Sequence, residues 1–333
     1  MSRLRGVLGR GAWRRTMLIF FAIFAFFGFA LSIAQGVADI HVRDVWHILL
    51  YPSANTADQI IWNIRLPRAL TGALVGSNLA LSGAILQAVM RNPLADPHII
   101  GISAGAGLLG IIVLVVLPSF VYLMTPVAFI GAMLAATAIY FLAWKDGIKP
   151  VRIILAGVAV SAFLSAAISA ILIFYSDRVH GALLWLVGGL ASSSWQDVTV
   201  IFPYAVIGFI LAFFGAFYLN MLQLGDDMAR GLGLNVEAAR LGLTAVAALL
   251  AASAVSVAGL LGFVGLIVPH IVRLLVGNDY RYIIPGSAFF GMATVLCSDT
   301  VARVILAPAE LPVGIIMAFL GAPFFLFLLR REV

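Results

Sequence analysis

The sequence predicts an all-α, polytopic membrane protein with about ten transmembrane helices. Hydrophobic residues make up 63% of its 333 residues, charged residues make up 10%, and the mean hydropathy is +1.12. Soluble domains hold about 45–50% apolar and about 25% charged residues. Because a helical span needs roughly 20 apolar residues, a chain of this length with short loops has room for about ten spans. This composition excludes a soluble globular enzyme, so any soluble chemistry must come from a partner.

Ten apolar runs carry the expected spans, and no linker divides them, so residues 1–333 are expected to form one transmembrane domain. The spans are expected over 17–36, 69–90, 99–117, 124–144, 152–175, 198–220, 241–259, 261–277, 283–300 and 311–329. The stretch over 241–277 is too long for one helix, and its glycines at 259, 262 and 265 together with Pro269 mark an expected break. The shorter run over 182–189 is expected to form a partial helix.

The distribution of basic residues predicts the orientation, because the side richer in Lys and Arg stays cytoplasmic. With ten spans and an inner N-terminus, fifteen of the 20 Lys and Arg residues fall on the inner side. The outer side then holds Arg43, Arg65, Arg68, Arg178 and Arg303. We therefore expect both termini to be cytoplasmic. The basic pI of about 9.8 reflects this anchoring and does not indicate a nucleic-acid partner.

No pattern in the sequence indicates a catalytic, metal or nucleotide site. The chain has only two lysines, Lys145 and Lys149, and neither follows a glycine-rich loop of the G-x-x-x-x-G-K-[ST] type. Its five histidines are scattered without metal-ligand spacing, and Cys297 is the single cysteine. We expect no catalytic residue, metal or cofactor in this chain, so an integral membrane enzyme is a distant alternative and energy must come from a partner.

Ionisable residues are nearly absent from the expected spans, where a charge costs about 2.5–3.5 kcal/mol on insertion scales. Asp299, near the outer end of the ninth span, is the main candidate for an ion path. Arg303 lies four residues later on the same helical face, so the two charges can neutralise each other. A local ion pair is favoured over a proton relay, and a proton-coupled secondary carrier is the more distant alternative.

The most informative loop is the expected cytoplasmic segment over 222–241, which reads LQLGDDMARGLGLNVEAARL. Its glycines separate two short helical patches, Asp226 to Arg230 and Val236 to Arg240. Asp226 and Asp227 stand where acidic residues favour a helix start, and Arg230 where a basic residue favours a helix end. Short helices on a membrane surface can serve as docking elements, although an ordinary solvated loop is an equally good interpretation of this pattern.

Five stretches together carry a family resemblance along nearly the whole chain after the first span. They are RLPRALTGALVGSNLALSGAILQAVMRNPLADPHIIGISAGAG over 65–107, ILAGVAVSA over 154–162, LGDDMARGLGLNVEAARLG over 224–242, GFVGLIVPHIVRLLVGNDYRYIIPGSAFFGMATVLCSDTVAR over 262–303 and ELPVGIIMAFLGAPFFLFLL over 310–329. In this order they closely resemble the FecCD family, the permease subunits of type II ABC importers for iron-siderophore complexes, haem and cobalamin.

The resemblance implies the type II ABC importer permease fold and a set of partners. Such permeases have ten spans, form a homodimer or a close heterodimer, and bind two cytoplasmic ATPase subunits and an external substrate-binding protein. ATP and Mg would be bound by the ATPase and not by this chain. The loop over 222–241 would be the coupling segment that sits in a cleft of each ATPase. The residues that would make this coupling are Asp226, Asp227, Arg230, Gly231, Gly233, Val236 and Arg240.

The outer arginines also gain a role from the resemblance. Arg65, Arg68 and Arg303 match family positions that pair with acidic residues on the lobes of the binding protein. Arginine suits bidentate pairing with carboxylates, and rim charges set encounter rate and register. Two alternatives remain for these residues, which are snorkelling to the membrane interface and structural pairing with Asp299.

The sequence contains fewer signals for the translocation path than for the coupling segment. In the family, a gate lies near the connection into the fifth span, which corresponds here to Lys149, Pro150 and Val151, where the family often has small hydroxyl residues. Ser161 and Ser165 recur four residues apart along that span and could face the path. Close helix packing is the commoner reason for small residues at this spacing.

Taken with the resemblance, these patterns predict the membrane-spanning permease of an ATP-driven importer in a bacterial or archaeal cytoplasmic membrane. The expected cargo is a ferric siderophore, with haem or cobalamin as alternatives. The expected partners are two ATPase subunits, a second permease copy, a substrate-binding protein and membrane lipid.

Overall fold

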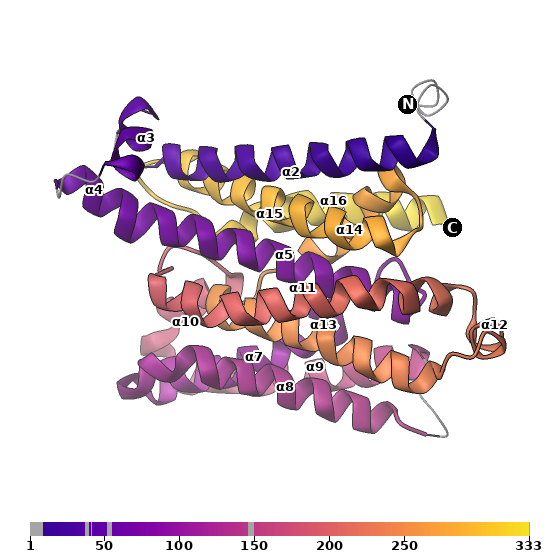
Figure 1. Ribbon diagram of the computed structural model, residues 1–333. Helices are drawn as coiled ribbons and strands as arrows, with labels where there is room; N and C mark the ends of the chain where they lie inside the picture. The colour runs from indigo at the N-terminus through magenta and orange to yellow at the C-terminus, as the bar shows by residue number, and fades with distance from the viewer. Residues whose placement is uncertain (1–8, 37–39, 41, 52–54, 146–149, 333) are drawn as a thin grey trace.

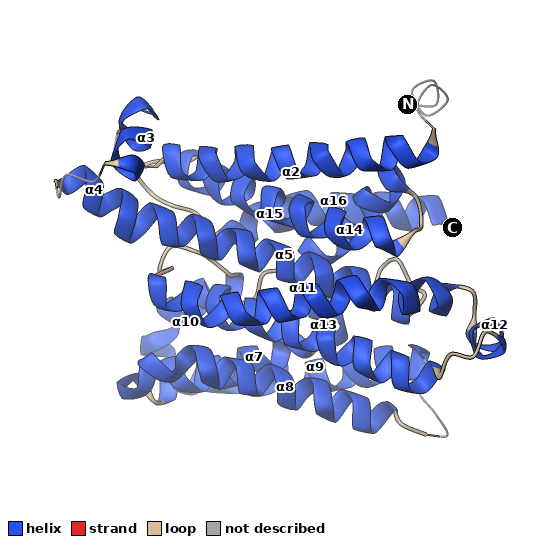
Figure 2. Cartoon of the chain, in the orientation of Figure 1, coloured by secondary structure: helices blue, strands red, loops and turns tan. Residues whose placement is uncertain are grey.

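The computed structural model describes residues 9–332 except 37–39, 41, 52–54 and 146–149, and it is a helical bundle without strands in the part described (Figures 1 and 2). The long helices are α2 (Arg10–Ala34), α5 (Leu66–Val89), α7 (Ile102–Ile111) with its extension η2 (Ile112–Val116), α8 (Met124–Ala143), α9 (Pro150–Phe174), α11 (Trp195–Gln223), α13 (Val236–Ala258), α14 (Val264–Val276), α15 (Tyr280–Val304) and α16 (Val313–Glu332). The short helices are α3 (Val42–Leu50), α4 (Thr56–Ile60), η1 (Ile61–Arg65), α6 (Pro97–Ile100), η3 (Pro118–Leu123), η4 (Ser176–Arg178), α10 (Val179–Val187) and α12 (Asp226–Gly231).

Every expected span coincides with a helix, which confirms the all-α fold. Seven of the described helices are long and apolar enough to cross a membrane, and three further apolar helices, over 102–116, 264–276 and 313–328, are shorter. The total of ten crossings therefore stays a prediction. The partial helix expected over 182–189 is confirmed as α10, which ends at Val187.

The stretch over 241–277 breaks as the sequence predicts, but not through its proline. Helix α13 ends at Ala258, Gly259 adopts φ +71°, and α14 begins at Val264. Pro269, expected at the break, instead lies inside α14, which continues to Val276. This expectation was wrong because a membrane helix tolerates proline where packed neighbours compensate for the missing hydrogen bond.

Helix α5 is the centre of the bundle. It runs on from α4 and η1 as one helix over 56–89, and 83% of its most apolar window is buried. It packs on α11, α13, α14 and α15. The approach is close where Gly83 meets the backbone of Gly265 in α14 and where Gly76 meets that of Gly291 in α15, because a Cβ at either glycine would clash with the facing carbonyl.

The two ends of the bundle differ in what they carry. Helix α12 and both ends of the described chain lie at one end, here named the elbow end, while α3, α4 and α10 lie at the opposite end (Figure 1). Residues Arg65 and Arg68 stand near the start of α5, which also lies opposite α12, so this end is named the arginine end. On the periphery, only 11% of the apolar window of α9 is buried.

Candidate functional site

A buried charge cluster occupies the arginine end. Arg68 donates two hydrogen bonds to the carboxylate of Asp299, from Nε to Oδ2 at 3.0 Å and from Nη2 to Oδ1 at 2.9 Å. The same carboxylate accepts a third contact from Arg303, whose Nε lies 3.1 Å from Oδ2. Arg68 is 6% exposed, Asp299 1% and Arg303 3%. One buried carboxylate therefore pairs with arginines from two helices, α5 and α15.

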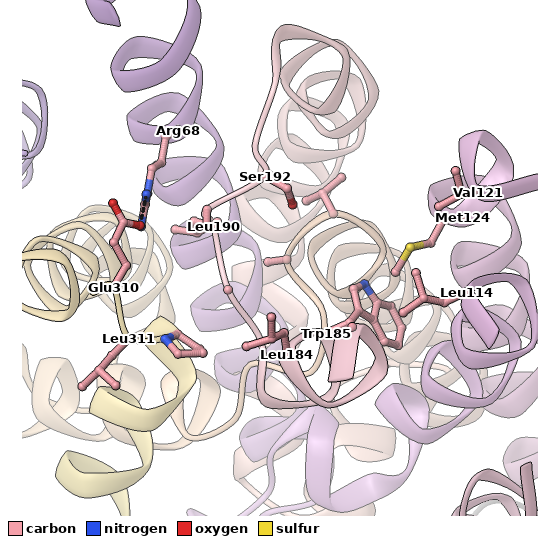
Figure 3. A pocket seen from close by; sticks show the side chains of 16 residues that line it. Arg68, Leu114, Val121, Met124, Leu184, Trp185, Leu190, Ser192, Glu310 and Leu311 are labelled. Carbon is pink, nitrogen blue, oxygen red and sulfur yellow. Dashed lines mark hydrogen bonds and ion pairs between the residues drawn. The ribbon is translucent and has the colours of Figure 1, made fainter. Parts of the chain in front are cut away.

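Glu310 closes the cluster on its solvent side. It accepts a hydrogen bond from Arg68 Nη1 at 2.7 Å, the contact drawn in Figure 3, and its side chain is 30% exposed. The residue lies in the loop between α15 and α16, whereas Asp299 lies inside α15. Arg68 thus pairs with two carboxylates, those of Asp299 and Glu310, and only Glu310 is exposed to solvent.

Arg303 and Arg65 also bind backbone carbonyls at the end of α2. Arg303 Nη1 donates to the Gln35 carbonyl at 2.9 Å, and its Nη2 donates to the carbonyl and hydroxyl of Ser32 at 3.0 Å each. Arg65 Nη1 donates to the carbonyls of Ile33 and Ala34 at 3.0 and 2.9 Å. Both side chains satisfy carbonyls that a helix end leaves without an intrahelical partner.

The sequence predicts binding-protein docking by Arg65, Arg68 and Arg303, and the structure places all three in one cluster that the chain itself already satisfies. The structural pairing with Asp299, kept as an alternative, is present. The cluster still borders open space, because a hollow of about 360 Å³ is lined by the three arginines and Glu310. The docking role itself stays a prediction.

A second cavity lies on the other side of the Arg68–Glu310 pair. It has a volume of about 440 Å³ and is lined mainly by apolar side chains, including Leu114, Leu184 and Trp185 (Figure 3). Arg68 and Glu310 line both hollows, so their ion pair is part of the wall of each.

At the elbow end, α12 and the turn that follows it project from the bundle (Figure 1). The helical patches expected in this segment are confirmed as α12 and the first turn of α13. Asp226 anchors the segment, because its Oδ1 lies 2.8 Å from Arg240 Nη2 in α13 and 3.5 Å from Arg91 Nη2, just beyond α5. Arg240 is 2% exposed, as is Val236, so these two residues hold the base of the segment and do not form its surface.

The tip of this segment is exposed and partly apolar. Of the predicted coupling residues, Asp227, Arg230, Gly231 and Gly233 are exposed, whereas Asp226 is partly buried. Met228 and Leu232, which are not among the predicted coupling residues, are 61% and 62% exposed. Large apolar side chains beside charges on a projecting helix are typical of a docking surface. The signal was available in the sequence as two apolar residues inside a loop bounded by glycines.

The predicted path residues that the structure describes all lie on α9. Pro150 is the first residue of α9, Val151 beside it is 66% exposed, and Lys149 lies outside the described residues. Ser161 is half-buried, and its hydroxyl lies where a Cβ on Gly101 would clash, so the glycine permits this close approach of α9. Ser165 is exposed, and its carbonyl accepts a hydrogen bond from Ser169 at 2.9 Å.

A further anchor at the elbow end was not foreseen. Asp279, which precedes α15, accepts hydrogen bonds from Arg281, Asn220 and Arg14, so it joins α15 to α11 and α2. Hydrogen bonds from Arg281, with one from Asn220, lower the pKa of Asp279 to about 2, so its carboxylate stays charged at any physiological pH.

Within the described ranges, no group of three or more His, Cys, Asp or Glu side chains is placed to hold a metal ion. The arrangement instead defines a class. A largely apolar helical bundle, with a projecting segment at one end and a buried charge cluster at the other, is typical of a multi-span membrane protein.

The chain belongs to the FecCD transport family, whose model matches residues 23–331. It is 41% identical over 322 residues to an Fe(3+)-citrate import system permease of Bacillus subtilis, covering 97% of this chain and 96% of that protein. It is 46% identical over 281 residues to a cobalamin import system permease of Halobacterium salinarum, covering 84% and 75%. It is 41% identical to a hemin transport system permease of Yersinia pestis, covering 90% and 91%.

Solved structures share the fold. An inward-facing metal-chelate type ABC transporter superposes with a TM-score of 0.84 at 27% identity, covering 95% of this chain and 99% of the other. The PsaBC complex of Streptococcus pneumoniae superposes with a TM-score of 0.59 at 18% identity, covering 81% of this chain and 92% of the other. At this identity the likeness shows the fold alone. The chain is therefore the permease of an ABC importer and not an enzyme, and a permease of this class works with an ATPase and a substrate-binding protein. This result replaces the secondary carrier as an interpretation.

Proposed function

We propose that this permease imports a ferric chelate of the siderophore or citrate type. The support is the match to a ferric-citrate permease, which extends over 97% of this chain and 96% of that relative. An Fe(3+)-hydroxamate permease of Bacillus subtilis is also 41% identical, over 92% of this chain. The solved structure with the same fold at 27% identity is a metal-chelate type transporter.

The observation that carries the mechanism is the separation of two different surfaces on one bundle. In this proposal, exposed Met228 and Leu232 at the elbow end contact an ATPase that binds ATP and Mg²⁺, and a loaded binding protein docks over the hollow lined by the buried Arg65, Arg68 and Arg303. Movement of the elbow under ATP binding would tilt the helices that rise from it. The path would alternate between openings at the two ends, with few strong contacts to the cargo.

A second permease copy completes the proposed path. Helix α9 is strongly apolar, with a mean hydropathy of 2.3, yet only 11% of its window is buried in this chain. We expect α9 to face both lipid and the second copy, with Pro150, Val151, Ser161 and Ser165 beside the path. The elbow end would face the cytoplasm, with both termini there, in a bacterial or archaeal cytoplasmic membrane.

Haem and cobalamin are the competing cargoes, because permeases for each are 41% and 46% identical to this chain. Cells that lack the chain and are complemented with it should be supplied with ⁵⁵Fe-citrate, a ⁵⁵Fe-hydroxamate, haem or labelled cobalamin. Uptake of either iron chelate that requires the chain and a functional ATPase subunit supports the proposal. Uptake of haem or cobalamin alone, or iron uptake that persists without the ATPase, contradicts it.

A further inference from the structure

Helix α5 ends in a backbone conformation that is unusual for its residue. Arg91, one residue beyond the helix cap, adopts φ +49°. Its amide donates to the Ala88 carbonyl, and the next amide, that of Asn92, donates to the Gln87 carbonyl, each at 3.1 Å. These are the two hydrogen bonds of a Schellman motif, in which the left-handed position is usually glycine. An arginine there strains the backbone.

The same motif elsewhere in this chain shows the ordinary solution. At the end of α12, Gly233 adopts φ +84°, its amide donates to the Arg230 carbonyl at 2.9 Å, and the amide of Leu234 donates to the Ala229 carbonyl at 3.0 Å. Two helices that the Arg91–Asp226 contact links thus end in the same way, α12 with glycine and α5 with arginine. The arginine side chain must therefore supply something that glycine cannot.

The contacts of Arg91 show what it supplies. Its Nη2 lies 3.5 Å from Asp226 Oδ1, the carboxylate that also binds Arg240. Its Nη1 lies 3.5 Å from the place where a Cβ on Gly225 would be, at the turn that leads into α12. The Arg91 side chain is 43% exposed, and ion pairs that exposed contribute little to stability. Fold stability alone is therefore a poor reason to hold a strained arginine here.

We propose that Arg91 is a positioning residue for coupling, which fixes the base of the projecting segment, and so its exposed tip, to the end of α5. The other end of the same helix carries Arg68. The helix runs unbroken over 56–89, which at 1.5 Å per residue is about 50 Å, enough to cross the bundle. A displacement at the arginine end would thereby be transmitted to the elbow end through the buried helix over 56–89 and the Arg91–Asp226 ion pair.

This inference rests on the proposed contact between the elbow and the ATPase, and its test uses the assembled transporter. The Arg91→Gly variant removes the side chain and relieves the strained backbone, and Arg91→Lys keeps the positive charge. The permease, its ATPase subunits and its binding protein are reconstituted in proteoliposomes. The measured quantities are the unfolding temperature of the permease and the stimulation of ATP hydrolysis by the loaded binding protein.

Arg91→Gly should unfold at or above the temperature at which the unmodified protein unfolds. The stimulation of ATP hydrolysis by the loaded binding protein should nevertheless fall at least three-fold in this variant. Arg91→Lys should restore at least half of the loss, although it keeps the backbone strain. Full stimulation in Arg91→Gly, or no recovery in Arg91→Lys, would overturn the inference.

A crosslinking control separates this failure from failure of the proposed function. In a Cys297→Ser background, Leu232→Cys should crosslink to the ATPase subunit with Arg91 intact. Absence of that crosslink would defeat the proposed coupling contact itself. A normal crosslink together with unaltered stimulation in Arg91→Gly would defeat only the role of Arg91.

Discussion

The arginine end and the elbow end both hold arginines paired with carboxylates, but they expose their charges to opposite degrees. At the arginine end, Arg68, Asp299 and Arg303 are each at most 6% exposed and satisfy one another. At the elbow end, Asp226 is partly exposed and the tip beyond it carries open apolar side chains. A partner at the elbow meets a surface already formed, whereas a partner at the arginine end must compete with the chain's own acids.

The two ends should therefore differ in how strongly their side chains contribute to the free energy of unfolding. Removing one member of a buried ion pair leaves an uncompensated charge, which is costly, whereas changes on an exposed tip leave the fold intact. Substitutions at the arginine end should therefore act first on folding, and substitutions at the elbow first on association.

The largest expected effect is that of Asp299→Asn. It leaves the guanidinium of Arg303 without a buried anion and leaves Arg68 with Glu310 alone, so we expect a loss of about 3–5 kcal/mol in the free energy of unfolding. Denaturant titration of the purified permease in detergent measures it. Asp227→Asn, at an exposed carboxylate of the elbow, is the control and should change stability by less than about 0.5 kcal/mol. Equal stability of the two variants would contradict the proposed contrast between the ends.

The second prediction concerns the elbow tip. Met228→Asp with Leu232→Asp should leave unfolding unchanged, because both side chains are more than 60% exposed, but should weaken ATPase binding by at least about 2 kcal/mol, roughly thirty-fold. Co-purification and a binding titration with the ATPase subunit measure this effect. Met228→Leu with Leu232→Met keeps the tip apolar and should bind normally. Undiminished binding of the acidic variant would show that the tip is not the docking surface.

The sequence predicts much of this fold because hydropathy is a local signal. Each apolar run became a helix, and the break after Ala258 follows from the glycines that come next. Pro269 misled because the effect of a proline inside a helix depends on packed neighbours, which a linear pattern does not contain.

The site was less predictable because its decisive contacts are distant or conformational. The Asp299–Arg303 pair follows from a spacing of four residues, but the Arg68–Asp299 pair joins residues 231 positions apart. Arg91 stands out through its positive φ, and an arginine in the sequence does not predict that backbone conformation. The exposed Met228 and Leu232 could have been found, since apolar residues in a short polar loop need a reason.

A smaller effect is expected from Glu310→Gln at the arginine end. The change weakens the hold of this solvent-facing residue on Arg68 Nη1 and frees that nitrogen for a partner's carboxylate. Affinity for the binding protein should rise by about 1 kcal/mol, roughly five-fold, measured by titration with the permease in nanodiscs. Asp177→Asn, at an exposed acid that pairs with Arg178, is the matched control and should change little. An unaltered affinity in Glu310→Gln would mean that Glu310 and the partner do not compete.

The smallest expected effects separate two glycines of the elbow that the sequence treats alike. Gly233 adopts φ +84°, so Gly233→Ala strains the backbone although no atom obstructs the new methyl group. Gly231 is the last residue of α12 and is equally open, so Gly231→Ala should stabilise that helix. Each change is worth at most about 1 kcal/mol, with opposite signs. Hydrogen exchange of the amides over 226–234 should quicken about five-fold in Gly233→Ala and slow in Gly231→Ala, while the amides of α5 stay unchanged. Unchanged exchange over 226–234 in Gly233→Ala would show that the left-handed conformation of this residue does not stabilise the elbow segment.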